Sequence, residues 1–308
     1  CIRDSLSAVM LLVTALSTLA ASVFLVLTGE ARYRFVPPLV LLLSAGVNGA
    51  LLTGDLFNLF VWVEVMLMPS YALIALTGTW RRLGIGRLFV LVNLLTSTVL
   101  LIGVGFVYGT AGTVNLAALA GAGGEDQVTA AALVVVLLAL AVKGGMVPVH
   151  SWLPRAYPAT SAGIMALFSA LHTKVALYAI YRIVAVAFGD ELPFLTVFAV
   201  LVLATILVGA FSTAAATRVR TAMGHQMVTG VGHILLGLVL LTQLSVTAGI
   251  LYLVHHVITM SSLLLTTGAL EHTYGSGRLD RLSGRARREP WVMAVMALLT
   301  ASVGPGPN

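Results

Sequence analysis

Long apolar runs recur along almost the whole chain, and they limit its fold more than any other feature does. Hydrophobic residues make up 59% of the 308 residues and charged residues only 9%, against about 25% charged residues in a soluble domain. A run of about 20 apolar residues is long enough to cross a bilayer as a helix. Strand alternation is absent, so a β-barrel is disfavoured. The chain is therefore predicted to be an all-α polytopic membrane protein.

The runs predict about nine full transmembrane helices and a truncated tenth, in a single transmembrane domain that fills residues 1–308. The chain begins at Cys1 and ends in S-V-G-P-G-P-N after about half a helix, so we expect a fragment of a longer protein. The predicted spans are 5–28, 37–53, 56–78, 86–109, 129–153, 159–182, 194–216, 222–243 and 248–270, and the tenth opens near residue 290.

Arginine is distributed unequally between the two sides that these spans define. When alternate loops are assigned to alternate sides, one side receives 13 arginines, and the other receives only Arg3 and Arg182 with four acidic residues. This bias places the first residues outside and the Arg278–Arg288 loop in the cytoplasm. It also explains the net charge of +6, so no nucleic-acid partner is expected. The 13 are Arg32, Arg34, Arg81, Arg82, Arg87, Arg155, Arg218, Arg220, Arg278, Arg281, Arg285, Arg287 and Arg288.

The only two lysines, Lys143 and Lys174, each lie near the centre of a predicted helix. A cation at the bilayer centre costs roughly 2.5–3.5 kcal/mol on insertion scales. Arginine stays charged, whereas a buried lysine can release its proton. Arginine in the loops and lysine within the helices therefore indicate a protein that moves a proton.

Glu64 is the only acidic residue placed near the middle of a predicted span. A buried carboxylate must be neutral or have a basic partner, and Lys143 is the obvious candidate. Two interpretations stay open: a structural ion pair that joins two helices, or a pair whose making and breaking controls the lysine proton. Asp55, just before the same apolar run, is expected to be a helix N-cap.

The segment from Lys143 to Pro148, K-G-G-M-V-P, predicts an interrupted helix. Proline removes a backbone donor and the glycines loosen the preceding turn. Non-helical backbone inside a membrane is tolerated where it lines protein or a wet cavity, and such breaks beside charged residues mark ion sites in transporters. The alternative is a simple proline kink.

Several polar side chains near the lysines are candidate relay members. His150 follows the break and His172 precedes Lys174 by two residues, and each is either a relay member or a packing histidine. Lys174, Tyr178 and Tyr181 share one helix face, which is expected to point into the bundle.

The remaining loops carry weaker signals. The 110–128 loop is predicted to be small, flexible and without chemistry. The loop 271–289 is rich in arginine, which the topology explains, although an anionic headgroup or a partner subunit stays open as a ligand. Cys1 is the only cysteine, and no glycine-rich phosphate loop follows a strand, so no metal or cofactor site is predicted.

Four motifs, in order along most of the chain, resemble the proton-pumping antiporter-like membrane subunits. This family includes the A-type and D-type subunits of Mrp cation/proton antiporters and the large membrane subunits of respiratory complex I and related hydrogenases. The first and last motifs look most like the D-type Mrp subunits. The motifs are G-D-L-F-N-L-F-V-W-V-E-V-M-L-M-P-S-Y, K-G-G-M-V-P-V-H-S-W-L-P-R-A-Y-P, L-H-T-K-V-A-L-Y-A-I-Y-R and L-Y-L-V-H-H.

The resemblance implies both a fold and roles for particular residues. Glu64 resembles the family's helix-pairing glutamate, Lys143 its central lysine in a broken helix, and Lys174 the lysine of the next helix. The implied fold has two inverted repeats of five helices, the first over 37–182 and an incomplete second over 194–308, with its break near Gly304–Pro307.

The implied function is a proton-translocating subunit of a multisubunit Na⁺ or K⁺/proton antiporter in a bacterial plasma membrane. Such a subunit is a secondary transporter component rather than an enzyme, and its partners are other antiporter subunits. The alternatives are a proton-pumping subunit of an NADH:quinone oxidoreductase or membrane-bound hydrogenase, and an inactive scaffold.

Two positions depart from the family pattern. The family usually has lysine four residues after the second histidine of the pair, where this chain has Met260. Methionine carries no proton, so the second half of the polar axis is interrupted. His256, one turn earlier on the same face, is a candidate substitute. The end also differs from the family's G-I-P-P-L-S-G-F.

Overall fold

The computed structural model describes residues 5–76, 80–189, 192–282 and 290–303, and ten long helices carry this part of the chain. Shorter helices are α5 (Ala122–Glu125), α7 (Trp152–Ala156) and α12 (Leu279–Leu282). The long helices are α1 (Ser5–Leu27), α2 (Val36–Leu52), α3 (Leu56–Ala75), α4 (Trp80–Ala111), α6 (Gln127–Gly144), α8 (Ala162–Ile183), α9 (Leu195–Ala214), α10 (Val219–Leu236), α11 (Gln243–Tyr274) and α13 (Pro290–Val303).

Seven of these helices are long and apolar enough to cross a membrane: α1, α3, α4, α6, α8, α9 and α11. α2 coincides with a predicted span but has only 17 residues. α10 overlaps the predicted span 222–243 but ends at Leu236, and His225, His233 and Arg220 make it more polar than the other spans. The chain is therefore an all-helical, multi-pass membrane protein.

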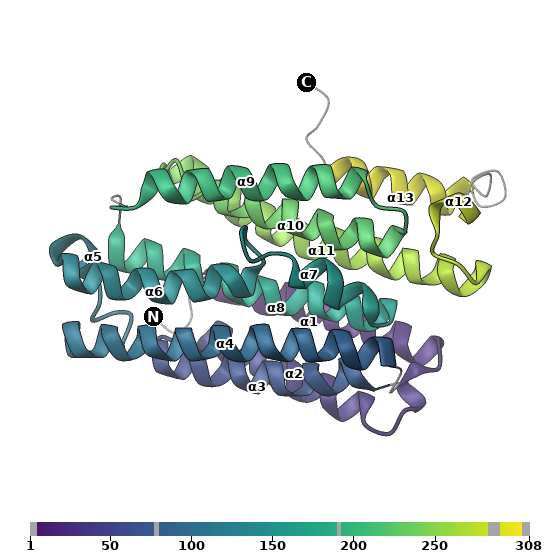
Figure 1. Ribbon diagram of the computed structural model, residues 1–308, viewed down its shortest axis with the longest axis horizontal. Coiled ribbons are helices and arrows are strands. Elements are labelled where there is room, and N and C mark those ends of the chain that lie inside the picture. Colours follow the sequence, from purple (N-terminus) through teal and green to yellow (C-terminus); the bar gives the residue numbers. More distant parts are fainter. Residues whose placement is uncertain (1–4, 77–79, 190–191, 283–289, 304–308) are drawn as a thin grey trace.

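Helix α8 is the centre of the bundle. It contacts α1, α2, α3, α6, α10 and α11, and Figure 1 shows it between the layer of α2, α3 and α4 and the layer of α9, α10 and α11. Every residue from Ala162 to Ile183 is buried except Arg182. A helix that is buried all round belongs to the core of a large bundle, which matches its nearly continuous apolar sequence.

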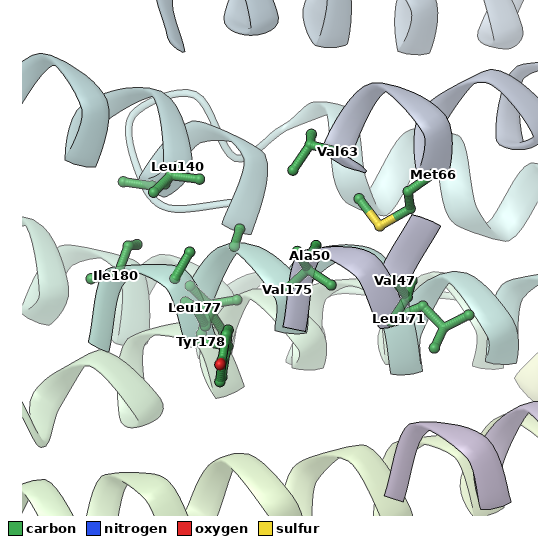
Figure 2. Close-up of a cluster of buried hydrophobic side chains, with 14 of the residues drawn as sticks. Val47, Ala50, Val63, Met66, Leu140, Leu171, Val175, Leu177, Tyr178 and Ile180 are labelled. Carbon is green, nitrogen blue, oxygen red and sulfur yellow. The ribbon is translucent and has the colours of Figure 1, made fainter. Parts of the chain in front are cut away.

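Close packing of aliphatic side chains fixes α2, α3 and α6 against α8. In Figure 2, Val47 and Ala50 of α2, Val63 and Met66 of α3 and Leu140 of α6 lie around Leu171, Val175 and Leu177 of α8. Burial of each large aliphatic side chain stabilises the arrangement by about 1.5–3 kcal/mol. This packing positions the polar groups described below.

The predicted helix break is confirmed, and it lies at Gly145 rather than at Pro148. α6 ends at Gly144 because Gly145 adopts φ 89°, a left-handed conformation that glycine takes without strain. The freed backbone groups find partners: Trp152 Nε1 donates to the carbonyl of Val142 at 3.1 Å, and the amide of Val147 donates to Thr205 Oγ1 of α9 at 3.1 Å. These hydrogen bonds therefore stabilise the break in the helix.

The loop predicted over 110–128 is folded against the bundle, which corrects the expectation of a flexible segment. Leu116 and Leu119 are buried, and Asn115 pairs with Asp55 through an isolated β-bridge. The amide of Leu56 donates to the carbonyl of Val114 at 2.9 Å. This loop therefore braces the first turn of α3, where Asp55 accepts from the amide of Asn58 at 2.8 Å and caps the helix as predicted.

Candidate functional site

Lys143 ends α6 with its side chain inside the bundle. Only 6% of the residue is exposed. Its Nζ donates to Ser97 Oγ at 2.8 Å and lies 3.4 Å from the carbonyl oxygen of Asn93, both on α4. The last turn of a helix presents free carbonyls and a partial negative charge, which favours a cation at this position.

Ser97 connects Lys143 to Glu64. Its hydroxyl donates to Oε1 of Glu64 on α3 and accepts from the lysine. Among the residues that the structure describes, no ion pair joins Glu64 directly to Lys143. Ser97 therefore mediates the predicted pairing of Glu64 with Lys143, and the two residues belong to one hydrogen-bonded chain of three side chains.

Ser97 and Asn93 were not predicted as site residues, although α4 carried a signal. The two residues are four apart and so lie on one face of an apolar helix, in the segment V-N-L-L-T-S-T. Their side chains are buried, and the Asn93 amide donates to the carbonyl of Phe89 at 2.9 Å. Two polar residues at this spacing in a membrane span indicate that a neighbouring helix presents a charged side chain to them.

A small cavity separates Lys143 from His172 of α8. It offers about 10 Å³ to the centre of a water molecule, and Lys143, His172 and Asn93 line it together with apolar side chains of α3, α6 and α8. About one water molecule fits such a space when polar groups face it. The structure thus brings His172 near Lys143, with room for one bridging water.

His172 is held at both ring nitrogens. Nε2 lies 2.7 Å from Ser70 Oγ, and Nδ1 lies 3.3 Å from the hydroxyl of Tyr157. The imidazole packs against Phe168, with ring centroids 4.5 Å apart. Ser70 and Tyr157 were not predicted from the sequence, because nothing local distinguishes a serine or a tyrosine that meets a histidine 102 or 15 residues away.

Lys174 points away from this cavity. Positions 172 and 174 are about 200° apart around a helix, so they face opposite sides of α8. Lys174 is completely buried, and its Nζ lies 3.1 Å from Thr173 Oγ1. A titratable neighbour on that side is His256 of α11. The backbone of α8 therefore stands between the two halves of the expected proton path.

His256 is buried without hydrogen-bond partners. Its residue exposure is 0%, and neither ring nitrogen has a partner among the described residues. The ring lies against the backbone of α10 at Gly230, where a Cβ would overlap Nε2. Met260, one turn later on α11, is also completely buried. In the second half of the predicted polar axis, no hydrogen bond among the described residues thus connects Lys174 to His256.

The two tyrosines that share a predicted face with Lys174 diverge instead of lining one path. The Tyr178 hydroxyl donates to the carbonyl of Leu51 in α2 at 2.8 Å and lies 2.6 Å from Ser7 Oγ of α1. The Tyr181 hydroxyl donates to the carbonyl of Ile234 in α10 at 2.5 Å. All three side chains are buried in the bundle, as expected for this face, and the two hydroxyls join α8 to different helices.

His150 lies half-buried in the break between α6 and α7. Its electrostatic neighbour is His225 of α10. Neither histidine has a hydrogen-bond partner at Nδ1 among the described residues. The structure does not connect His150 to His172 or to either lysine.

The fold and this buried polar chain define a class of membrane protein. Residues 53–307 match the family described as NADH:quinone oxidoreductase/Mrp antiporter, TM, so the chain belongs to that family.

Curated relatives agree with this assignment. The chain is 37% identical over 274 residues to the D-type subunit of the Na(+)/H(+) antiporter of Alkalihalophilus pseudofirmus, and 34% identical over 311 residues to the D-type subunit of the Na(+)/H(+) antiporter of Bacillus subtilis. These alignments cover 87% and 98% of this chain but only 55% and 63% of the relatives, so the chain spans between half and two thirds of their length.

Among solved structures, a chain of the Mrp complex from Dietzia sp. DQ12-45-1b superimposes with a TM-score of 0.95 at 50% identity, covering 99% of this chain and 58% of that one. Respiratory complex I from Thermus thermophilus shares the fold, with a TM-score of 0.87 at 24% identity over 98% of this chain and 64% of that one.

Proposed function

We propose that the chain is the proton-translocating part of the D-type subunit in a multisubunit monovalent cation/proton antiporter. The observation that carries this proposal is the chain of Glu64, Ser97 and Lys143 beside a helix break, with a water-sized cavity leading to His172. Similarity to the D-type subunits of two Na(+)/H(+) antiporters supports Na⁺ as the exchanged cation, with K⁺ as the alternative. The transported ions are the protein's cargo, and no cofactor is part of the proposal.

The proposed mechanism starts with protonated Lys143. Hydrogen bonds to Ser97, backed by the Glu64 carboxylate, stabilise the ammonium in a buried position. When Lys143 moves away from Ser97, burial disfavours its charge, and the proton passes to a water in the cavity. The acceptor is His172, whose ring Ser70 and Tyr157 hold toward the cavity.

The proton then has to reach the opposite side of α8, where Lys174 and His256 lie. A change in the packing of α8, or a water chain around it, must form the link in this proposal. The membrane potential supplies roughly 2.3 kcal/mol per charge per 100 mV, comparable to the cost of moving a charge between such sites. His150 and His225 are proposed to admit protons at the break from the side that carries most arginines.

The topology belongs to the same proposal. Nine spans and a tenth that begins at α13 place the N-terminal residues outside and the loop after α11 in the cytoplasm of a bacterium. The helices from α2 to α8 form the first inverted repeat, and those from α9 onward form the second. Other subunits of the antiporter are the proposed partners. The predicted second break, at 304–307, lies outside the described residues.

The test uses the complete gene with its neighbouring subunit genes, in a strain that lacks its own antiporters. Collapse of ΔpH by Na⁺ and by K⁺ is recorded in inverted vesicles for wild type and for Lys143→Ala. The proposal predicts collapse in wild type and none above background in the variant, at equal membrane levels of protein. Collapse of equal size in both would overturn the role of Lys143.

A redox-linked proton pump is the second candidate, because the fold of complex I superimposes over almost the whole chain. The identity of 50% to the Mrp chain, against 24% to complex I, favours the antiporter. Wild-type vesicles that show no cation-dependent ΔpH collapse would favour the redox pump or an inactive scaffold. Flavin and iron–sulfur subunits encoded beside this gene would then distinguish the pump from the scaffold.

A further inference from the structure

Arginines from three separate segments of the chain meet around one cavity at the end of the bundle where α4 and α10 begin. The cavity has a volume of about 550 Å³, within the range of small-ligand sites, about 300–1,000 Å³. The residues that line it include Glu271, Thr221 and five arginines, namely Arg82, Arg218, Arg220, Arg278 and Arg281.

Hydrogen bonds between two backbone segments shape this arginine pocket. Arg218 and Arg278 form an isolated antiparallel bridge, with the Val219 amide donating to the Gly277 carbonyl at 3.0 Å. The Leu279 amide donates to the Thr217 carbonyl at 3.1 Å. The segment before α10 and the segment after α11 are therefore fastened together, although 60 residues separate the two arginines.

Arg220 is fixed as part of the wall. Its Nε lies 2.8 Å from Oε2 of Glu271, and its Nη1 donates to the carbonyl of Thr160. Only 26% of its side chain is exposed. An arginine held at one end by a carboxylate and a carbonyl keeps its other guanidinium hydrogens in a fixed direction.

The pocket holds more positive charge than its carboxylates balance. Glu271 balances Arg220, and Asp280 balances Arg278 through a contact of 2.9 Å between Oδ2 and Nη2. Of the five cations, Arg218 and Arg281 therefore have no carboxylate partner among the described residues. Helix α10 begins at this pocket, and no side chain caps its N-terminus. The N-terminus of a helix adds a partial positive charge.

The positive-inside bias explains why arginines lie on this side of the bilayer, but it does not explain why they converge. Arg34 and Arg155 belong to the same predicted side and do not line the pocket. Like charges around one cavity repel one another, and a bound anion relieves that repulsion. The planar fork of arginine matches the oxygens of a phosphate group.

We propose that this arginine pocket binds a phosphate group, carried either by an anionic lipid headgroup or by a soluble phosphate. The phosphate oxygens would contact Arg218 and Arg281 at the exposed rim and Arg220 on the wall. Because the pocket shares no lining residue with the cavity beside Lys143, this site does not depend on the proposed proton path.

The test compares two double variants in the intact, purified antiporter complex. Arg218→Gln/Arg281→Gln removes two exposed rim cations, and Arg34→Gln/Arg155→Gln removes two exposed arginines elsewhere on the same predicted side. One arm measures retention of phosphatidylglycerol and phosphatidylcholine by native mass spectrometry. The other measures binding of radiolabelled inorganic phosphate by equilibrium dialysis after removal of lipid.

Loss of the two rim arginines is expected to weaken anion binding about 10- to 30-fold, while the control pair changes it less than about twofold. Retention of phosphatidylglycerol that inorganic phosphate does not displace would identify a lipid headgroup as the source. Saturable binding of inorganic phosphate without lipid would identify a soluble phosphate. Equal loss in both double variants, or equal retention of the two lipids by wild type, would overturn the proposal.

Discussion

The two buried lysines lie on opposite sides of α8 in very different surroundings. Lys143 belongs to a hydrogen-bonded chain with Ser97 and Glu64 and borders a cavity with His172. Lys174 is completely buried beside Thr173, and its neighbour His256 has no hydrogen-bond partner among the described residues. One buried lysine of this fold is thus linked to a carboxylate by a hydrogen-bonded side chain, and the other has only a hydroxyl beside it. In the proposed function, the linked lysine is the one that exchanges its proton.

After Lys143→Ala, the largest effect is expected from Glu64→Gln, which removes the charge but keeps the shape of the side chain. A hydrogen bond to a charged group contributes about 1.5–3 kcal/mol, so transport should fall about tenfold or more. Cation-dependent ΔpH collapse in inverted vesicles measures this, with immunoblotting as the control for insertion. Wild-type activity in the variant would reject the Glu64 switch.

The two lysines should respond differently to replacement by methionine, which has similar length and no charge. Lys143→Met leaves Glu64 and Ser97 without their cation and should destabilise the fold by about 1–3 kcal/mol. Lys174→Met removes a buried amine that pairs with no carboxylate among the described residues, and its effect on stability should be neutral or favourable. The midpoint of thermal unfolding of the purified complex measures the stability of each variant. Equal decreases in stability for both variants would contradict a difference between the two lysines.

A steric change beside His256 should have an intermediate effect. In Gly230→Ala the new methyl group overlaps a completely buried imidazole, so it should destabilise by about 1–3 kcal/mol. Gly105→Ala in α4 is the matched control, because a Cβ there meets no atom within 4 Å, and the better helix propensity of alanine favours it. Equal melting temperatures for the two variants would contradict the close contact of α10 and α11 at His256.

The smallest effect should come from the cap of α6, far from both lysines. Hydrogen bonds from the Thr129 side chain, and from the amides of Thr129 and Val128, hold the pKa of Asp126 below its usual value. Its contribution to stability is therefore present above the ordinary range of aspartate, about pH 4, and is lost as pH falls through the lowered pKa.

Thermal melts between about pH 6 and pH 3 test this cap. Asp126→Asn keeps a capping side chain without the titration, so its melting temperature should depend less on pH than that of wild type. Asp126→Ala should be less stable at the upper end of this range. Parallel pH profiles for wild type and Asp126→Asn would contradict a role for the Asp126 charge.

The helices and the break were well predicted from the sequence, because these depend on local patterns. Apolar runs located the long helices, although several ends differ from the predicted ones: α4 begins at Trp80 rather than at residue 86, and α10 ends at Leu236 rather than at residue 243. The glycines after Lys143 located the break. Glu64 and both lysines stood out, because an ionisable residue in an apolar run is rare.

Contacts that depend on how helices pack could not be predicted in the same way. The position of Ser97 between Glu64 and Lys143 depends on how α3, α4 and α6 pack together. A single serine in the sequence does not indicate this position. The opposite directions of His172 and Lys174 follow from helix geometry, but what each one faces is decided by α6 and α11. The same holds for Tyr178 and Tyr181, which share a predicted face and bond to different helices.

The central claim is that Glu64, Ser97 and Lys143 act as one unit. A double-mutant cycle of Glu64→Gln and Ser97→Ala, with ΔpH collapse as the readout, tests it most directly. If both residues act on Lys143 through one bridge, the double variant should be no slower than Glu64→Gln alone. Losses that multiply would show two independent roles and would contradict the bridge.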